Sequence, residues 1–369
     1  MLITLDDLRS FAVTRSLFAP TTLKRALHRM GFVQADPIRA PARAQDLILR
    51  HRVKDYRAGD LERLYAKLDV EEDFFVVYGF MTKSLHALMH PRSDACVPAE
   101  GRSPWPAARK KKAQLLMEFI HKRGAVHPRE VDDHFSHGTV TNYWGGSSNA
   151  TTHLLAAMHY RGMLRVARRK SGIRIYTAHR HGPGPADASE RQARIDGLVD
   201  AAVQIYAPLP GACLSDLVRR LRFAVPQWQD ELKSALQRAK QRFAHTQVDG
   251  VEWYWPAGED ARRCAPPDKV RLLAPFDPVV WDRDRFEVLW GWVYRFEAYT
   301  PAAKRKLGYY ALPLLWRDRV IGWGNVLMKN GKHEFEFGYV NSHVPRDRTF
   351  KRELECEVDR MRTFLALET

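Results

Sequence analysis

The stretch GFVQADPIRAPARAQD, residues 31–46, places an amide and a carboxylate two positions apart, where an apolar run breaks at a proline. The run predicts a short strand, and in an extended chain Gln34 and Asp36 project from the same face. Pro37 disfavours the helical region for the residue before it, which keeps Asp36 extended. Such a pair can orient a water molecule and stabilise a positive centre. On residue types alone, it can equally be the capping groups of an ordinary strand end.

Helical patterns surround this strand. They run from Asp6 or Asp7 to about Ser16, from Thr21 to Met30 with a stop at Gly31, and over about 42–53. Helix, helix, short strand and helix is the opening of a winged-helix-like unit. We place this unit at residues 1–97, ahead of a linker rich in proline and glycine.

The pattern is sharper over residues 107–180. Apolar residues at helical spacing predict a helix over 110–121, and Pro128 starts a short second helix. A third helix is expected from a cap at Ser147 or Ser148 to Met163. Alternating segments 164–166 and 173–176 then predict a hairpin with a basic tip. Three helices and a hairpin predict a central, basic winged helix.

The same order of elements recurs over residues 188–257, where Asp249-Gly250 predicts the hairpin turn. Residues 268–369 are β-rich and end in an amphipathic helix. The predicted fold class is therefore α+β, with three tandem winged-helix units and a β-rich C-terminal unit. Tryptophans of that last unit are expected in its core rather than stacked on bases.

The charge of the chain indicates a polyanionic partner. Lys and Arg number 59 against 43 Asp and Glu, a net charge of +16, which favours nucleic acid first and an anionic membrane surface second. Residues 134–186 contain no acid at all. The candidate DNA contacts in this stretch are Arg165, Arg168, Arg169, Lys170 and Arg174. The alternative is a solvated surface hairpin in a generally basic protein.

Other features narrow the class of protein. The four cysteines are far apart, and the start of the chain has no signal-peptide pattern, so we expect a cytoplasmic protein with no membrane span. His134 and His137 have ligand-like spacing, but without cysteines or paired carboxylates nearby we expect no metal. Glycine-rich nucleotide motifs are absent, and no cofactor is expected.

Three stretches together resemble a known family. They are VQADPIRAPARAQD at 33–46, EEDFFVVYGF at 71–80 with LMHP at 88–91, and LAPFDPVVWDR at 273–283 followed by YTPAAKR at 299–305 and GYY at 308–310. This combination resembles the YcaQ/AlkX/AlkZ group of winged-helix DNA glycosylases that unhook crosslinks. The resemblance spans nearly the whole chain.

The resemblance implies three winged helices joined to a small C-terminal β-barrel-like unit. It implies a Gln-x-Asp active site at Gln34 and Asp36, of the YcaQ/AlkX type. Arg39 and Arg43, which follow this motif in the sequence, are further candidate DNA contacts. The implied substrates are N-alkylated purines in double-stranded DNA, chiefly N7-alkylguanine, including interstrand crosslinks. We expect a monomeric, nucleoid-associated enzyme.

The residues of the motif suit this chemistry. An N7-alkylated guanine is already cationic and leaves readily, so the enzyme needs a carboxylate for the sugar cation and for a water molecule. Gln34 can position that water, since an amide both donates and accepts hydrogen bonds. The motif contains no lysine for Schiff-base chemistry, which favours a monofunctional hydrolase. The alternative function is a non-catalytic winged-helix regulator, which usually reads a two-fold site as a dimer.

Overall fold

The computed structural model describes residues 2–92, 105–135, 138–141, 147–262, 264–330, 332–340 and 344–365. The chain forms two compact units, and neither is a continuous stretch of sequence. Unit 1 contains residues 1–61, 202–216 and 240–369, and unit 2 contains residues 62–201 and 217–239. The four consecutive segments expected from the linkers divide the chain differently and stay a prediction.

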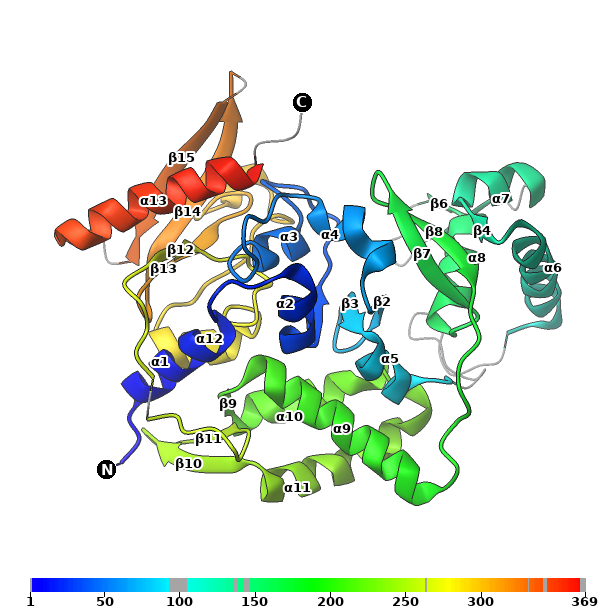
Figure 1. The fold of residues 1–369 in the computed structure, drawn as a ribbon, viewed down its shortest axis with the longest axis horizontal. Helices are drawn as coiled ribbons and strands as arrows, with labels where there is room; N and C mark the ends of the chain where they lie inside the picture. Colours follow the sequence, from blue (N-terminus) through cyan, green and yellow to red (C-terminus); the bar gives the residue numbers. More distant parts are fainter. Residues whose placement is uncertain are drawn as a thin grey trace. The chain divides into compact units, whose positions relative to one another are not determined.

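Unit 1 contains helices and strands from both ends of the chain (Figure 1). They are α1 Leu5–Ser16, α2 Leu23–Met30, β1 Phe32–Gln34, α3 Ala44–Leu49, β9 Leu209–Pro210, β10 Ala244–Val248, β11 Val251–Trp255, β12 Val270–Leu272, α12 Arg283–Trp290, the 3₁₀ helix η4 Ala302–Lys304, β13 Leu312–Trp316, β14 Arg319–Lys329, β15 Lys332–Tyr339 and α13 Arg348–Leu365.

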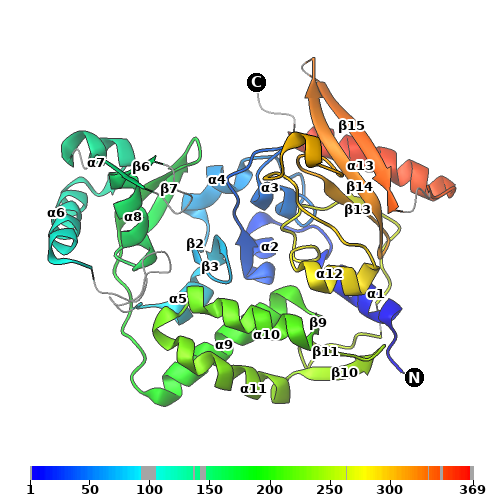
Figure 2. The ribbon, with the colours of Figure 1, turned by 180° about the vertical axis from the view of Figure 1, so that it is seen from behind.

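Unit 2 has smaller sheets and a set of helices (Figure 2). They are η1 Tyr65–Lys67, β2 Val70–Phe74, β3 Tyr78–Thr82, α5 Lys83–Met89, α6 Ala107–Arg123, β4 Ala125–Val126, α7 Pro128–Phe135, β5 Thr139–Thr141, β6 Ser147–Asn149, α8 Ala150–Tyr160, β7 Leu164–Lys170, β8 Ile173–Ala178, η2 Leu221–Phe223 and η3 Pro226–Glu231. The helices that run across the boundary in sequence are α4 Asp60–Leu64, α9 Ala188–Tyr206, α10 Gly211–Arg220 and α11 Leu232–Arg242.

The C-terminal strands form an antiparallel sheet in the order β12-β13-β14-β15, with α13 lying across it (Figure 1). Glu357 of α13 is fully buried, and its carboxylate accepts a hydrogen bond from the Leu272 N–H at 2.9 Å and pairs with Arg50. This strand order is an antiparallel meander, and the barrel-like form of the C-terminal unit stays a prediction.

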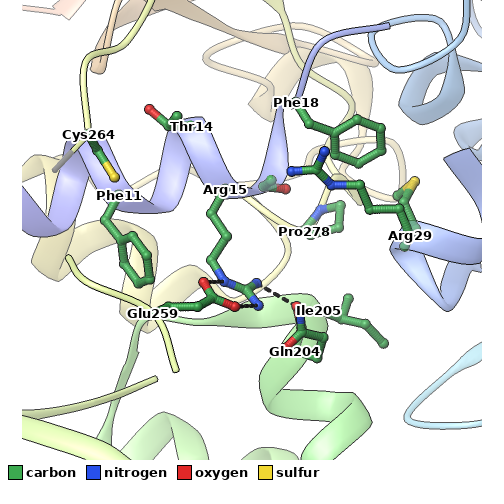
Figure 3. A pocket seen from close by; sticks show the side chains of 12 residues that line it. Phe11, Thr14, Arg15, Phe18, Arg29, Gln204, Ile205, Glu259, Cys264 and Pro278 are labelled. Atoms are coloured by element: carbon green, nitrogen blue, oxygen red, sulfur yellow. Dashed lines mark hydrogen bonds and ion pairs between the residues drawn. The ribbon is translucent and has the colours of Figure 1, made fainter. Parts of the chain in front are cut away.

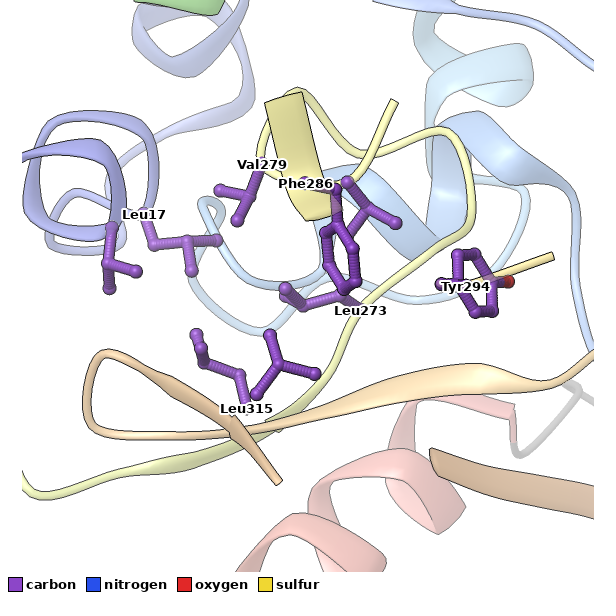
Figure 4. Packing of buried hydrophobic residues seen from close by; sticks show 9 residues of the cluster. Leu17, Leu273, Val279, Phe286, Tyr294 and Leu315 are labelled. Atoms are coloured by element: carbon purple, nitrogen blue, oxygen red, sulfur yellow. The ribbon is translucent and has the colours of Figure 1, made fainter. Parts of the chain in front are cut away.

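The core of unit 1 confirms the structural interpretation of several tryptophans. Buried side chains from α1, α12, β13 and the segment before α12 pack together, including Leu17, Leu273, Phe286 and Leu315 (Figure 4). Trp290 and Trp292 pack against this cluster, and Trp316 is buried. Aromatic rings in such a core contribute burial rather than a surface for stacking on bases.

Most local predictions agree with the structure. The Asp249-Gly250 turn joins β10 and β11, and both of its residues have positive φ, as a tight hairpin requires. One cap is wrong: Asn149, rather than Ser147 or Ser148, caps α8, because its side chain accepts a hydrogen bond from the Thr152 N–H. The prediction of a mixed helix and strand fold is confirmed. Within the described residues, no helix combines the length and the apolar character needed to cross a membrane.

Candidate active site

The candidate site begins where β1 ends. Gly31 ends α2 with φ of +69°, and the buried residues Phe32 and Val33 then lead the chain into β1. The strand ends at Gln34, earlier than the sequence pattern predicts. Asp36 lies beyond it, where its Oδ1 accepts a hydrogen bond from the Ile38 N–H at 2.9 Å. This Asx turn bends the chain at Pro37, so Gln34 and Asp36 share a strand end rather than a strand face.

Gln34 carries a buried acceptor without a partner. Its side-chain Oε1 is inaccessible to solvent and makes no hydrogen bond to any described residue. Leaving a buried acceptor unpaired costs about 1–3 kcal/mol, so such a group is satisfied when a water molecule or a substrate binds. The Gln34 Oε1 is therefore an unsatisfied acceptor two residues before Asp36.

The Asp36 carboxylate is half-buried. Burial raises its pKa above the ordinary value, and the hydrogen bond from Ile38 lowers it by a smaller amount. A carboxylate with a raised pKa accepts a proton more readily, which favours the role of a general base.

Two tyrosines from the far end of the sequence lie near this carboxylate. Burial and then the charge of Asp36 raise the pKa of both Tyr310 and Tyr299, so both phenols lie within electrostatic range of the acid. Tyr310 is buried and its hydroxyl has no partner among the described residues, whereas Tyr299 is 78% exposed. The ring of Phe296 packs edge-on against both, with centroids at 5.0 Å from Tyr310 and 6.3 Å from Tyr299. The structure thus brings the 299–310 segment to the Gln-x-Asp motif.

A buried ion pair links the chain that follows the motif to the 273–283 segment. The Arg52 guanidinium donates to both carboxylate oxygens of Asp277, at 2.7 and 3.0 Å, and to the carbonyl of Ile48. Both side chains are fully buried. Asp277 is therefore a structural acid that connects α3 to the C-terminal part of unit 1.

A cavity of about 270 Å³ lies elsewhere in unit 1 (Figure 3). Glu259 holds Arg15 with two bonds, at 2.7 and 2.9 Å, and Arg29 lies over the ring of Phe18 at 4.2 Å. Burial, and then the charge of Arg15, lowers the pKa of Arg29. Because its lining includes neither Gln34 nor Asp36, this cavity is not part of the candidate active site.

The basic hairpin β7–β8 does not present its cations on one face. Arg169 donates to both carboxylate oxygens of Glu72, at 2.9 and 2.5 Å, and Arg165 pairs with Glu71 at 2.6 Å. Arg174 lies over the ring of Tyr78 at 4.3 Å. These three arginines therefore have partners within unit 2, and their contact with DNA stays a prediction.

The exposed cations of this hairpin are Arg168 and Lys170, which flank Arg169 in β7. The i, i+2 spacing of these two residues is the sequence signal that separates them from Arg169. In unit 1, Arg39 is exposed in the segment after Asp36, and the half-buried Arg43 occupies the N-cap position of α3 without a capping hydrogen bond from its side chain. The roles of all four residues remain predictions.

A family model described as "DNA glycosylase AlkZ-like" matches residues 27–364, which is most of the chain. The chain therefore belongs to the AlkZ-like DNA glycosylase family, and it is a DNA glycosylase that acts in DNA repair. This membership decides against the alternative of a non-catalytic regulator.

One similar solved structure is the DNA glycosylase AlkZ of Streptomyces sahachiroi. The TM-score is 0.65 at 15% sequence identity, and the alignment covers 100% of this chain and 98% of that one. At this identity the likeness shows the fold alone.

Proposed function

We propose that this DNA glycosylase hydrolyses the N-glycosidic bond of N-alkylated purines, chiefly N7-alkylguanine, and unhooks interstrand crosslinks, with Gln34 and Asp36 as its catalytic residues. One observation carries the proposal. The half-buried Asp36 carboxylate, whose pKa is raised by burial, follows a Gln34 Oε1 that is buried without a partner. A water molecule bound between these two groups would donate one hydrogen bond to Gln34 Oε1 and its other proton to the Asp36 carboxylate.

The reaction balances without a cofactor. The bond from C1′ to N9 breaks, and its electron pair leaves with the base, which becomes neutral because the alkylated purine began as a cation. The sugar is left as an oxocarbenium-like cation, which the Asp36 carboxylate stabilises by its charge. A water molecule held by Gln34 adds to C1′ and gives its proton to Asp36. Because the motif has no lysine, the enzyme stops after base release and does not cut the strand.

The surroundings of the acid support this role. The buried phenol of Tyr310 is a neutral donor near Asp36, and the exposed ring of Tyr299 offers a flat apolar face beside it. A flat aromatic face can stack on a base at about 1–3 kcal/mol per contact. We propose that the damaged purine stacks on Tyr299 with its glycosidic bond toward the Asp36 carboxylate.

We also propose three tandem winged-helix units and a small β-barrel-like C-terminal unit, with double-stranded DNA bound by a monomer. The order α6, α7, α8, β7, β8 supports the central winged helix, and the order α9, α10, α11, β10, β11 supports the third. Arg168 and Lys170 near the hairpin tip, with Arg39 and Arg43 near the motif, are the proposed phosphate contacts. A DNA substrate places the enzyme at the chromosome, in the nucleoid of the cytoplasm.

The test is base release from DNA that contains N7-methylguanine. Asp36→Asn keeps the acceptor for the Ile38 N–H but removes the charge, so we expect release to slow about 10²–10⁴-fold while DNA binding is retained. The matched control is Asp359→Asn, because the side chain of Asp359 is 74% exposed on α13. Release at the wild-type rate by Asp36→Asn removes Asp36 from the mechanism. The same assay on crosslinked duplexes tests the wider substrate range.

A further inference from the structure

A cluster of imidazoles surrounds one buried acid in unit 2. Asp73 lies in β2 and is 1% exposed. His86 lies in α5 and His90 directly follows that helix, four positions later, so both imidazoles fall on the same side. The hairpin from β2 to β3 leads into α5, and this helix brings His86 and His90 back to Asp73. His90 Nε2 is 2.8 Å and His86 Nε2 is 3.3 Å from Asp73 Oδ2.

This cluster has an unsatisfied group and a route to solvent. His90 is buried, and its Nδ1 makes no hydrogen bond to any described residue. A cavity of about 300 Å³ adjoins the cluster, and its lining includes His86, His90, His179 and His181. The ring of His181 stacks on that of His90, with centroids 4.2 Å apart and an interplanar angle of 3°. An ion can therefore reach the imidazoles through a space lined by further imidazoles.

We propose that Asp73 Oδ2, His86 and His90 bind one divalent transition-metal ion, Zn²⁺ foremost, with a fourth position open to this cavity. One ligand atom from each of the three residues lies within 4.8 Å of the others. Zn²⁺ takes imidazole nitrogen at about 2.0–2.1 Å and carboxylate oxygen at about 2.0–2.2 Å, and sites with three protein ligands leave one position for water. Tetrahedral ligand atoms at those bond lengths lie roughly 3.4 Å apart. The spacing of Asp73 Oδ2 and His86 Nε2 is already close to this value, whereas Asp73 Oδ2 and His90 Nε2, at 2.8 Å, must move apart when the ion binds.

The surroundings already orient the carboxylate for this role. Arg92 donates to Asp73 Oδ1 at 2.9 Å, and the Phe74 N–H donates to the same oxygen at 2.6 Å. Both contacts leave Oδ2 turned toward the two histidines. Partners of this kind fix the direction of a ligating carboxylate in metal sites. A bound ion would connect β2 to α5 within unit 2, and the proposal does not rest on the proposed function.

The test is a titration of the full, tag-free chain with Zn²⁺ after removal of metals by a chelator. We expect one Zn²⁺ per chain by calorimetry, and the visible absorption of tetrahedral Co²⁺ when Co²⁺ is used as the probe. His86→Ala and His90→Ala should each weaken binding at least 100-fold. His121→Ala, an exposed histidine of α6, is the matched control and should bind as the wild type does.

Asp73 is not substituted, because the buried Arg92 would then lose the carboxylate that it pairs with and unit 2 would be destabilised. If a histidine variant fails to fold, the stoichiometry and Co²⁺ spectrum of the wild-type chain decide the question. The proposal is overturned if the wild-type chain shows no saturable binding of Zn²⁺. Asp73, His86 and His90 are then only a hydrogen-bonded network. Unchanged binding by the folded double variant His86→Ala/His90→Ala also overturns it, because other residues then hold the ion.

Discussion

Stability and activity oppose each other at Asp36. Burial raises the pKa of this carboxyl, so the folded chain binds its proton more tightly than the unfolded chain does. The stability contributed by the protonated form is fully present below the unfolded pKa and is lost as the pH rises through the folded pKa. At neutral pH the ionised acid is therefore a cost to the fold, and we interpret that cost as a requirement of catalysis.

This gives a prediction for thermal melts. Asp36→Asn should melt at a higher temperature than the wild type at pH 7, because the amide keeps the Ile38 contact without a half-buried charge. The difference should shrink as the pH falls toward 3. Melts of both proteins across this range test the prediction, with Asp359→Asn as the exposed control. A wild type that melts at the same temperature as the variant, or higher, at pH 7 contradicts it.

The raised pKa of Asp36 also determines the pH below which the rate of base release falls. Base release should fall as the pH drops through the raised pKa of Asp36, at a higher pH than an ordinary aspartate requires. The measurement is the single-turnover rate of N7-methylguanine release as a function of pH, corrected for spontaneous loss of the base. A rate that stays flat down to pH 4 contradicts a role for ionised Asp36.

At the scale of elements, the cations of the β7–β8 hairpin divide into those expected to bind DNA and those that stabilise the fold. Arg168→Ala/Lys170→Ala should weaken DNA binding and reduce the slope of log K against log salt by about 1.8, since each phosphate contact contributes about 0.9. Arg169→Ala is the matched comparison within the same strand. It should leave the slope nearly unchanged but destabilise the chain by about 3–5 kcal/mol, because the buried Glu72 carboxylate loses the guanidinium that donates to both of its oxygens. Binding at several salt concentrations and denaturant unfolding separate the two effects. An unchanged slope for the double variant removes the hairpin from the interface.

In unit 1, we expect a similar loss of stability when the buried Arg52–Asp277 ion pair is broken. Arg52→Ala should destabilise the chain by about 3–5 kcal/mol, because a fully buried carboxylate loses its partner. Lys83→Ala, which breaks a pair whose side chains are 51% and 47% exposed, should cost about 0–1 kcal/mol. Urea unfolding of the three proteins measures both. Equal costs for the buried and the exposed pair contradict the structural role of Asp277.

At the scale of the whole molecule, the net charge of +16 predicts strong, salt-dependent binding to undamaged duplex DNA. We expect the chain to be monomeric both free and bound, because the three winged-helix units that we propose would remove the need for a two-fold partner. Light scattering after size exclusion, with and without a short duplex, measures the mass. A dimer in either state contradicts the expectation.

Local features could be predicted because they depend on neighbours in sequence. The stop of α2 at Gly31, the Asp249-Gly250 turn and the apolar alternation of β7 and β8 each follow from a few adjacent residues. The family was predicted from motifs that occur together, and the match over residues 27–364 confirms it. The four-residue spacing of His86 and His90 was also readable, but nothing in the sequence indicates which acid faces them.

The charge, the local elements and the glycosylase family of this protein follow from its sequence alone. Which polar groups meet depends on the way distant segments pack. Arg169 pairs with Glu72, and Arg52 pairs with Asp277 across 225 positions. Asp36 lies near Tyr310, and Asp73 faces two histidines. The reason is physical: burying a charge is costly unless a partner is packed beside it, and that partner is selected by the packing of distant segments rather than by sequence spacing.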